Sequence, residues 1–356
     1  MGLTKRAVSS LVTCFSIAVC VLSTPPQAVF SHRILSHSTA FADQSRPSLA
    51  PLLGGSKVDL SKSPVALILT NEYMCTGLLV GKYEVVTAGH CLAAQSSEFI
   101  VRVGNEEHSV KQVVRSAAFS ENSPATLAFI KYDLGMLLLD SPVESIQPAP
   151  VLRDLRITQG DTVTVIGRGA NELLRGEEEL GQGRIGEFLV DDANGSVIVT
   201  TSLVKKSSTC PGDSGAPVFK RIGESLLAVG VVSAGTNFTN SQGRCVVNGR
   251  GLSVFVDLQS ESSQLFLSQF DGVKYASGRE QFVAERLQQL TSRITASTLK
   301  VRAPKLIKEL VKLRSLASGE QRLTIASMIR TLRALQANNS RKNHVTVLRK
   351  LRSLVL

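Results

Sequence analysis

Two stretches of sequence decide the fold and the chemistry: Thr87-Ala88-Gly89-His90-Cys91 and, far downstream, Cys210-Pro211-Gly212-Asp213-Ser214-Gly215-Ala216-Pro217. A serine hydroxyl is a weak nucleophile at neutral pH unless an imidazole accepts its proton during attack. A lone Gly-Asp-Ser-Gly could be an ordinary turn, but this one follows a Cys and leads into an apolar strand. The two stretches therefore indicate His90 as a base and Ser214 as a nucleophile.

Short apolar runs dominate the chain around these motifs. Runs of this length that are rich in Val, Ile and Leu and are bounded by turn residues favour strands. Asn194-Gly195 between two of them indicates a hairpin turn. The expected strands are Val65–Leu69, Leu78–Val86, Phe99–Val103, Met136–Leu139, Thr162–Ile166, Ser196–Thr200, Ala216–Phe219, Leu226–Val232 and Leu252–Val256. This pattern predicts an all-β sandwich or barrel.

At the His and Ser motifs the sequence resembles the chymotrypsin/trypsin family of serine peptidases, over about 200 residues from Leu52 to Leu258. The resemblance implies two antiparallel six-stranded β-barrels and a Ser-His-Asp triad. Asp133, which leads into the apolar run Leu134–Leu139, matches the family's third triad member. Asp140, at the far end of that run, is the competing carboxylate.

The resemblance also assigns the groups that bind substrate. The backbone N–H groups of Gly212 and Ser214 would form the oxyanion hole. The specificity pocket and its walls would consist of Ser208, Ser233, Gly235 and Gly251. A Ser at the pocket floor offers no charge to Arg or Lys, and glycine walls leave room for bulk. We therefore expect cleavage after medium or large apolar residues.

Activation is where the sequence departs from the family pattern. Family members are activated when cleavage frees an Ile or Val amine, which pairs with the Asp before the nucleophile, here Asp213. The best counterpart is Leu52-Leu53-Gly54-Gly55, which follows Pro51 and has no adjacent basic residue. Either another protease processes the chain as a zymogen, or Asp213 is held in some other way.

The N-terminus has the pattern of an export signal. Lys5 and Arg6 precede an apolar run, Ala7–Leu22, that is short for a membrane span. We expect residues 1–28 to be a signal peptide and 29–51 a propeptide or linker, in a protein that is secreted to the extracellular space or periplasm. An uncleaved anchor is the alternative. No later apolar run reaches the roughly 20 residues of a membrane helix, so no transmembrane segment is expected in the mature chain.

Of the six cysteines, two lie in this leader, which leaves Cys75, Cys91, Cys210 and Cys245. An even number in an exported protein predicts disulfides, for which three pairings exist. The resemblance implies Cys75–Cys91 and Cys210–Cys245. A zinc site would need cysteines two to four residues apart, and none are, so no metal is expected. No cofactor is expected either.

The last part of the chain has a different composition and period. From Asp271 onward there are 18 Lys+Arg and 5 Asp+Glu, a net of +13, whereas the whole chain carries +11. Four amphipathic helices are expected, around Val283–Ile294, Leu306–Ala317, Ile325–Leu332 and Val347–Leu354, with Pro304 in a first helical turn. The peptidase domain would then be residues 52–262, followed by a small basic α-helical extension at 263–356.

These observations predict a secreted serine endopeptidase that cleaves protein or peptide substrates through an acyl-enzyme intermediate. The alternative is a catalytically silent, peptidase-like protein that binds anionic partners through the basic extension. The extension could simply pack on the barrels, could bind an anionic surface or polymer, or could be a removable regulatory segment. Aromatic residues make up 5% of the chain and Trp is absent, so sequence-specific nucleic-acid binding is not expected.

Overall fold

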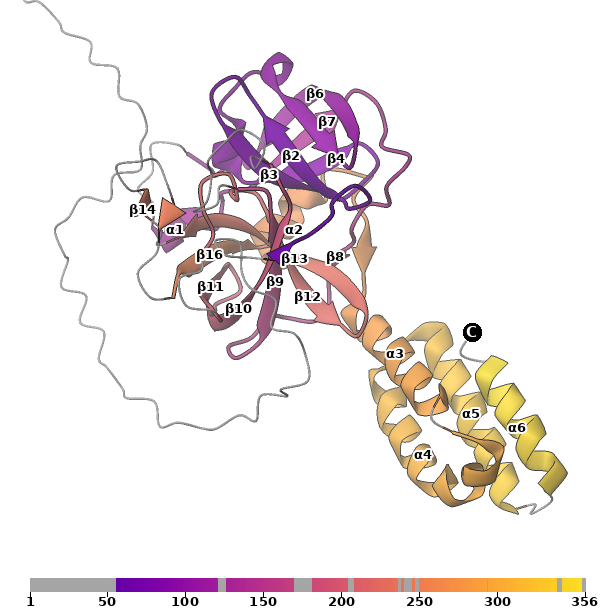
Figure 1. Cartoon of the computed structure of the whole chain (residues 1–356). Coiled ribbons are helices and arrows are strands. Elements are labelled where there is room, and N and C mark those ends of the chain that lie inside the picture. The colour runs from indigo at the N-terminus through magenta and orange to yellow at the C-terminus, as the bar shows by residue number, and fades with distance from the viewer. Residues whose placement is uncertain are drawn as a thin grey trace, which may run out of the picture. The chain divides into compact units, whose positions relative to one another are not determined.

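The computed structural model describes residues 56–120, 126–169, 181–203, 208–235, 238–239, 245–246, 250–292, 294–337 and 341–353. Its first barrel is closed by six antiparallel strands in the order β2-β3-β4-β7-β6-β5 (Figure 1). These strands are β2 (Val65–Leu69), β3 (Met74–Leu79), β4 (Glu84–Thr87), β5 (Ile100–Val103), β6 (Glu106–Arg115) and β7 (Gly135–Leu139). Their inward Val, Leu, Ile and Met side chains form a continuous buried core.

The second barrel closes because β12 pairs with both β9 and β13. Its six strands are β9 (Thr162–Gly167), β10 (Arg184–Ala193), β11 (Val197–Ser202), β12 (Pro217–Ile222), β13 (Ser225–Gly235) and β16 (Leu252–Asp257). The short strands β1 (Ser56–Lys57), β8 (Val151–Leu152) and β17 (Tyr275–Ala276) extend this sheet, and β14 (Phe238–Thr239) pairs with β15 (Cys245–Val246). The predicted pair of six-stranded barrels is confirmed.

Most predicted strands are present with small shifts at their ends, but one prediction was wrong. Leu78–Val86 is not a single strand: it contains the end of β3, a turn at Val80–Tyr83, and most of β4. The turn closes through N–H bonds from Val80 and Gly81 to the carbonyl of Glu84. Gly81 is required there, because a Cβ would collide with the Gly272 backbone. The apolar residues of the two strands conceal this turn in the sequence.

The predicted hairpin turn at Asn194-Gly195 joins β10 to β11. Gly195 has a φ of 77°, a conformation that costs glycine little. Asn194 Oδ1 accepts hydrogen bonds from the backbone N–H groups of Ser196 and Val197, at 3.0 and 3.1 Å. β6 and β10, which alternate polar and apolar residues, were not among the predicted strands.

Two short helical turns and two short helices connect the strands. The 3₁₀ turn η1 (Gly89–Leu92) carries His90, and η2 (Ser96–Glu98) follows it, while α1 (Leu127–Ile130) precedes Asp133. α2 (Glu261–Leu267) comes after the last strand of the second barrel. Yet its buried Phe266 and Leu267 belong to the apolar cluster that contains the first barrel's core. A truncation that leaves the barrels intact would therefore have to end beyond β17.

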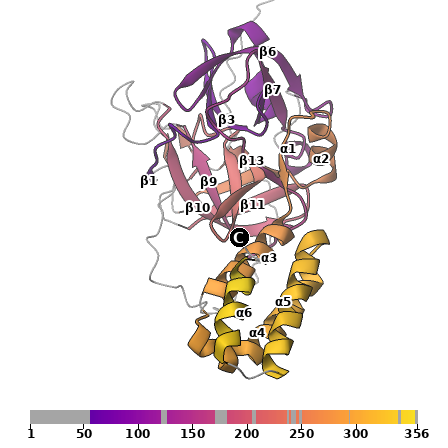
Figure 2. The ribbon, with the colours of Figure 1, turned by 90° about the vertical axis from the view of Figure 1, so that its right-hand side faces the viewer.

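The C-terminal part forms the helices α3 (Gly278–Ser292), α4 (Ala296–Leu316), α5 (Gly319–Ala337) and α6 (Arg341–Ser353). Helices α4, α5 and α6 lie side by side (Figure 2) and share an apolar core with α3. The prediction that Pro304 starts a helix was wrong. α4 begins eight residues earlier, where Thr295 and Thr298 form a capping box, and Pro304 lies inside the helix.

Hydrogen bonds join α3 to the second barrel. The Glu285 carboxylate accepts the backbone N–H of Glu224 at 2.9 Å, and Gln281 Nε2 donates to Ser225 Oγ at 2.9 Å. The Glu224 N–H and the Ser225 hydroxyl both lie at the β12–β13 turn, where Gly223 has a φ of 56°. A Cβ on Gly223 would collide with the Glu285 carboxylate. Glycine therefore lets the helix side chain approach the turn.

Candidate active site

The imidazole of His90 and the carboxylate of Asp133 form the centre of the candidate site. His90 Nδ1 lies 2.7 Å from Asp133 Oδ2, and the backbone N–H of His90 donates to Asp133 Oδ1 at 2.8 Å. Asp133 is 4% exposed, whereas the His90 side chain is 39% exposed. Gly89 lies against the carboxylate: a Cβ added to this residue would be only 3.2 Å from Asp133 Oδ1. Asp140, the competing carboxylate, is exposed at the end of β7.

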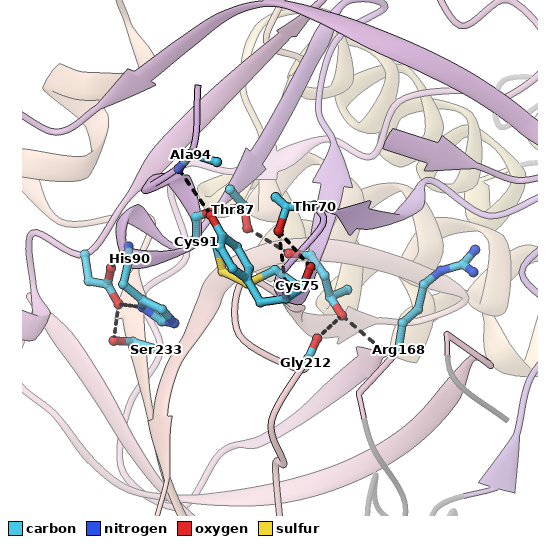
Figure 3. The surroundings of a disulfide bond; sticks show 12 residues. Thr70, Cys75, Thr87, His90, Cys91, Ala94, Arg168, Gly212 and Ser233 are labelled. Carbon is cyan, nitrogen blue, oxygen red and sulfur yellow. Dashed lines mark hydrogen bonds and ion pairs between the residues drawn. A yellow bond between two sulfur atoms is a disulfide. The ribbon is translucent and has the colours of Figure 1, made fainter. Parts of the chain in front are cut away.

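Ser233 supplies a third hydrogen bond to this carboxylate, from Ser233 Oγ to Asp133 Oδ2 at 2.6 Å (Figure 3). The pairing of β13 with β16 shifts register between Val232 and Ala234, so Ser233 is the extra residue of a β-bulge. Bulges re-aim side chains, and this one directs a hydroxyl at Asp133. The sequence predicted Ser233 as a substrate-binding strand residue, and this side-chain contact was not anticipated.

The pKa values of the pair shift in the direction that keeps Asp133 charged. Burial disfavours the carboxylate, but the Coulombic attraction of His90 and the hydrogen bonds from His90 and Ser233 outweigh it, and the pKa of Asp133 is lowered. Burial likewise disfavours a protonated His90, but the attraction of Asp133 and its hydrogen bond raise the pKa of the imidazole. The arrangement favours Nδ1–H donating to Asp133, which leaves Nε2 as the basic nitrogen.

The Ser214 turn is fixed against β3, which pairs with β4, the strand that leads to His90. The backbone N–H of Thr76 donates to the Ser214 carbonyl at 2.8 Å, and Thr76 Oγ1 donates to the Gly212 carbonyl at 2.8 Å. Gly215, with a φ of 80°, packs against Thr87 and Ala88, where a Cβ would have no room. The two sequence motifs thus meet. Thr76, which anchors the turn twice, was not singled out from the sequence, because an isolated Thr in a strand gives no signal.

A disulfide links this strand to the His90 turn. Cys75 and Cys91 are bonded with an S–S distance of 2.03 Å, as the resemblance implied (Figure 3). The Tyr73 hydroxyl donates to the Cys91 carbonyl at 3.1 Å and accepts the Ala94 N–H at 3.3 Å. The segment carrying His90 is therefore held by a covalent bond and by a half-buried phenol, whose pKa is raised by burial.

The predicted oxyanion donors are available. Gly212 has a φ of 91°, and in the described part of the chain neither its N–H nor that of Ser214 donates a hydrogen bond to another group. Ser214 is half-buried. No hydrogen bond joins Ser214 Oγ to His90 among the described residues. Contacts of this kind are often long without substrate and tighten in the reacting complex.

Asp213 is held by backbone amides. Its carboxylate accepts the N–H of Gly169 at 2.7 Å and that of Cys210 at 2.9 Å. Burial raises its pKa to about 7, against the opposing effects of these two hydrogen bonds and the charge of Arg184. The predicted start at Leu52 lies outside the described residues, so the pairing of a freed amine with Asp213 stays a prediction.

Two of the predicted pocket residues, Gly235 and Ser208, are linked to Ser253 of β16 directly or through a neighbour. Gly235 pairs with Ser253, and Thr209, the neighbour of Ser208, has its Oγ1 3.0 Å from Ser253 Oγ. The Gly251 carbonyl accepts the N–H of Ser202. Ser208 is fully buried, and its Oγ has no hydrogen-bond partner among the described residues. The predicted pocket floor is therefore a small, uncharged side chain.

The second predicted disulfide is described in part. Cys210 is disulfide-bonded, but the side chain of Cys245 lies outside the described residues, so the pairing stays a prediction. The predicted signal peptide (1–28) and propeptide or linker (29–51) also lie outside them. In the described residues no cluster of His, Cys, Asp or Glu could hold a metal ion. None of the helices described there is long and apolar enough to cross a membrane.

A sequence model of the trypsin family matches residues 52–250 of the chain. The chain belongs to the trypsin family. Among relatives of this trypsin-family chain, trypsin iota of Drosophila melanogaster is 28% identical over 200 residues, which are 52% of this chain and 78% of that protein. Trypsin 5G1 of Aedes aegypti is 27% identical over 242 residues, 58% of this chain and 86% of that protein. Mouse neuropsin, described as a serine protease expressed in the limbic system of the brain, matches with a TM-score of 0.47 and 18% identity, over 60% of this chain and 97% of its own.

Proposed function

We propose that this trypsin-family protein is a secreted serine endopeptidase in which Ser214 is the nucleophile, His90 the general base and Asp133 the residue that orients it. The observation that carries this proposal is the 2.7 Å contact between His90 Nδ1 and Asp133 Oδ2 beside a nucleophile turn that is bonded to the same barrel. Export is supported by the Cys75–Cys91 disulfide, since disulfides persist in oxidising compartments.

The chemistry follows from these positions. His90 Nε2 takes the proton of Ser214 Oγ as the oxygen attacks the scissile carbonyl, and Asp133 stabilises the imidazolium that forms. The imidazolium then protonates the leaving amine, which departs and leaves an acyl group on Ser214. A water molecule, deprotonated by His90, hydrolyses this ester. The N–H groups of Gly212 and Ser214 stabilise the oxyanion in both steps, each donor being worth about 3 kcal/mol of barrier.

We propose a preference for medium or large apolar side chains before the scissile bond. The support is the uncharged, buried Ser208 together with glycines at 235 and 251, where no side chain narrows the pocket. Profiling with a peptide library tests this. Strong selection for Arg or Lys by the unmodified enzyme would contradict it, whereas the Ser208→Asp variant should shift cleavage toward those basic residues.

Labelling with a fluorophosphonate tests the peptidase proposal directly. We expect one covalent adduct on Ser214, lost in Ser214→Ala and retained in Ser292→Ala, which removes an exposed hydroxyl on α3. The chain should first be treated with proteases that cleave near Leu52 and compared with untreated chain, so that a need for activation is not mistaken for inactivity. Absence of a Ser214-dependent adduct in both forms would favour the catalytically silent alternative.

A further inference from the structure

Helix α4 carries a row of lysines on the face that points away from the helical core. Lys305, Lys308 and Lys312, the lysine row, are exposed and follow the i, i+3, i+7 spacing of one helix face. The opposite face is buried through Leu306, Leu310 and Leu313. At 1.5 Å per residue the row is about 10 Å long. The three ammonium groups therefore follow one face along the helix axis.

Little negative charge compensates for this row. Residues 296–353, which contain α4, α5 and α6, carry 14 Lys+Arg and 2 Asp+Glu, a net of +12. Glu309, one of the two acids, lies 3.9 Å from Lys312 and 3.8 Å from Arg286. In the described part of the chain, Lys305 and Lys308 pair with no acidic side chain. Helix α5 adds the exposed Arg322, Arg330 and Arg333. A field of this strength attracts polyanions.

The composition of these helices narrows the class of polyanion. Residues 296–353 contain no Phe, Tyr or Trp, so they offer no platform for stacked bases and no aromatic anchor for a membrane interface. Their main apolar faces are already buried in the helical core, so in the described residues mainly separate side chains such as Val301 and Leu323 remain exposed to a lipid surface. The Cys75–Cys91 disulfide indicates an exported protein, which is separated from the nucleic acid of the cytosol and nucleus.

We propose that the lysine row is a binding surface for a linear sulfated polysaccharide. Lysine ammonium groups act as compact point charges, which bind sulfate or phosphate oxygens without demanding a fixed geometry. A row along one helix matches a chain with regularly repeated sulfates, and binding releases the counterions condensed on that chain. The surface lies on α4 and uses no residue of the candidate active site, so the inference does not depend on peptidase activity.

Heparin binding by the full-length chain tests this proposal. The variant Lys305→Gln/Lys308→Gln/Lys312→Gln removes three charges from the row. The matched control, Lys62→Gln/Lys111→Gln/Lys274→Gln, removes three exposed charges from the barrels and their flanking segments. With about 0.7 counterions released per contact, loss of the row should lower the slope of log K against log salt by about 2. This change in slope corresponds to about 40-fold weaker heparin binding at 0.15 M salt. The control variant should bind heparin with nearly the affinity of the unmodified protein.

Several outcomes would overturn the proposal. Equal weakening in the row variant and the control would show that only net charge matters. Tighter binding of duplex DNA, or of vesicles containing phosphatidylserine, than of heparin at the same salt concentration would assign the surface to another class of partner. Circular dichroism at 222 nm should be the same in all three proteins. If the row variant loses helix, Lys→Arg changes at the same positions must retain the binding of the unmodified protein, and failure to do so would also reject the proposal.

Discussion

Replacing Asp213 by Asn should remove the pH dependence that this carboxyl group gives to the stability of the fold. Asp213 is 1% exposed and its pKa is raised from 3.8 to about 7 by burial. A carboxyl group that binds its proton more tightly in the folded state stabilises the fold below pH 3.8, and this contribution is lost as the pH rises through about 7. The two pKa values give a loss of about 2 to 3 kcal/mol between pH 5 and pH 8.

The assay is urea unfolding of the unprocessed chain and of Asp213→Asn at pH 5 and pH 8. Asn cannot ionise. Its single side-chain oxygen can accept only one of the two backbone hydrogen bonds that the Asp213 carboxylate accepts, from the N–H groups of Gly169 and Cys210. That lost bond lowers stability equally at both pH values. The difference in unfolding free energy between the two proteins should therefore move by about 2 to 3 kcal/mol in favour of Asn at pH 8. Parallel pH dependences would refute the reasoning.

Three further predictions concern the catalytic pair and the α3 contact. Ser233→Ala removes a hydrogen bond to the Asp133 carboxylate, and we expect kcat/KM to fall about tenfold, consistent with roughly 1.5 kcal/mol for a bond to a charged group; an unchanged kcat/KM would contradict this. The pKa of His90 is raised, so kcat/KM should rise with pH with a midpoint above 6.5, and a midpoint at or below 6.5 would contradict the pairing with Asp133. Gly223→Ala should lower the unfolding free energy by about 1 kcal/mol more than Gly195→Ala. Both glycines have positive φ, but only a Cβ at 223 would displace Glu285, whereas 195 faces open space; equal losses in calorimetry would show that the Glu285 contact contributes nothing.

The sequence revealed the parts of the fold that local patterns encode. Val-rich and Leu-rich runs predicted most strands, because each must bury its side chains in a barrel core. The motif at His90 predicted a base, and the resemblance implied that Asp133 would lie beside it. What these patterns could not show are contacts set by tertiary geometry. The bond from Ser233 to Asp133 depends on a β-bulge, and bulges leave little trace in composition.

Other errors have similarly physical origins. The turn after Leu79 was hidden because apolar residues continue on both sides of it, and only its close contact with Gly272 shows why Gly81 is there. The start of α4 was placed at Pro304 because proline favours first turns, but the Thr295 capping box supplies the stronger signal. Thr76 joins the two barrels through hydrogen bonds to backbone atoms of Gly212 and Arg168. Every residue has such backbone atoms, so the sequence gives no sign of these contacts.

The position of α2 constrains the order in which the protein can fold. Its Phe266 and Leu267 complete a core whose other members begin near Leu60, so the first barrel keeps apolar surface exposed until nearly the whole peptidase region has left the ribosome. Domains usually fold from the N-terminus during synthesis. The core of the first barrel therefore includes contacts between residues about 200 positions apart in the sequence. Contacts of such long range are typical of slowly folding topologies, because a long loop must close before they form.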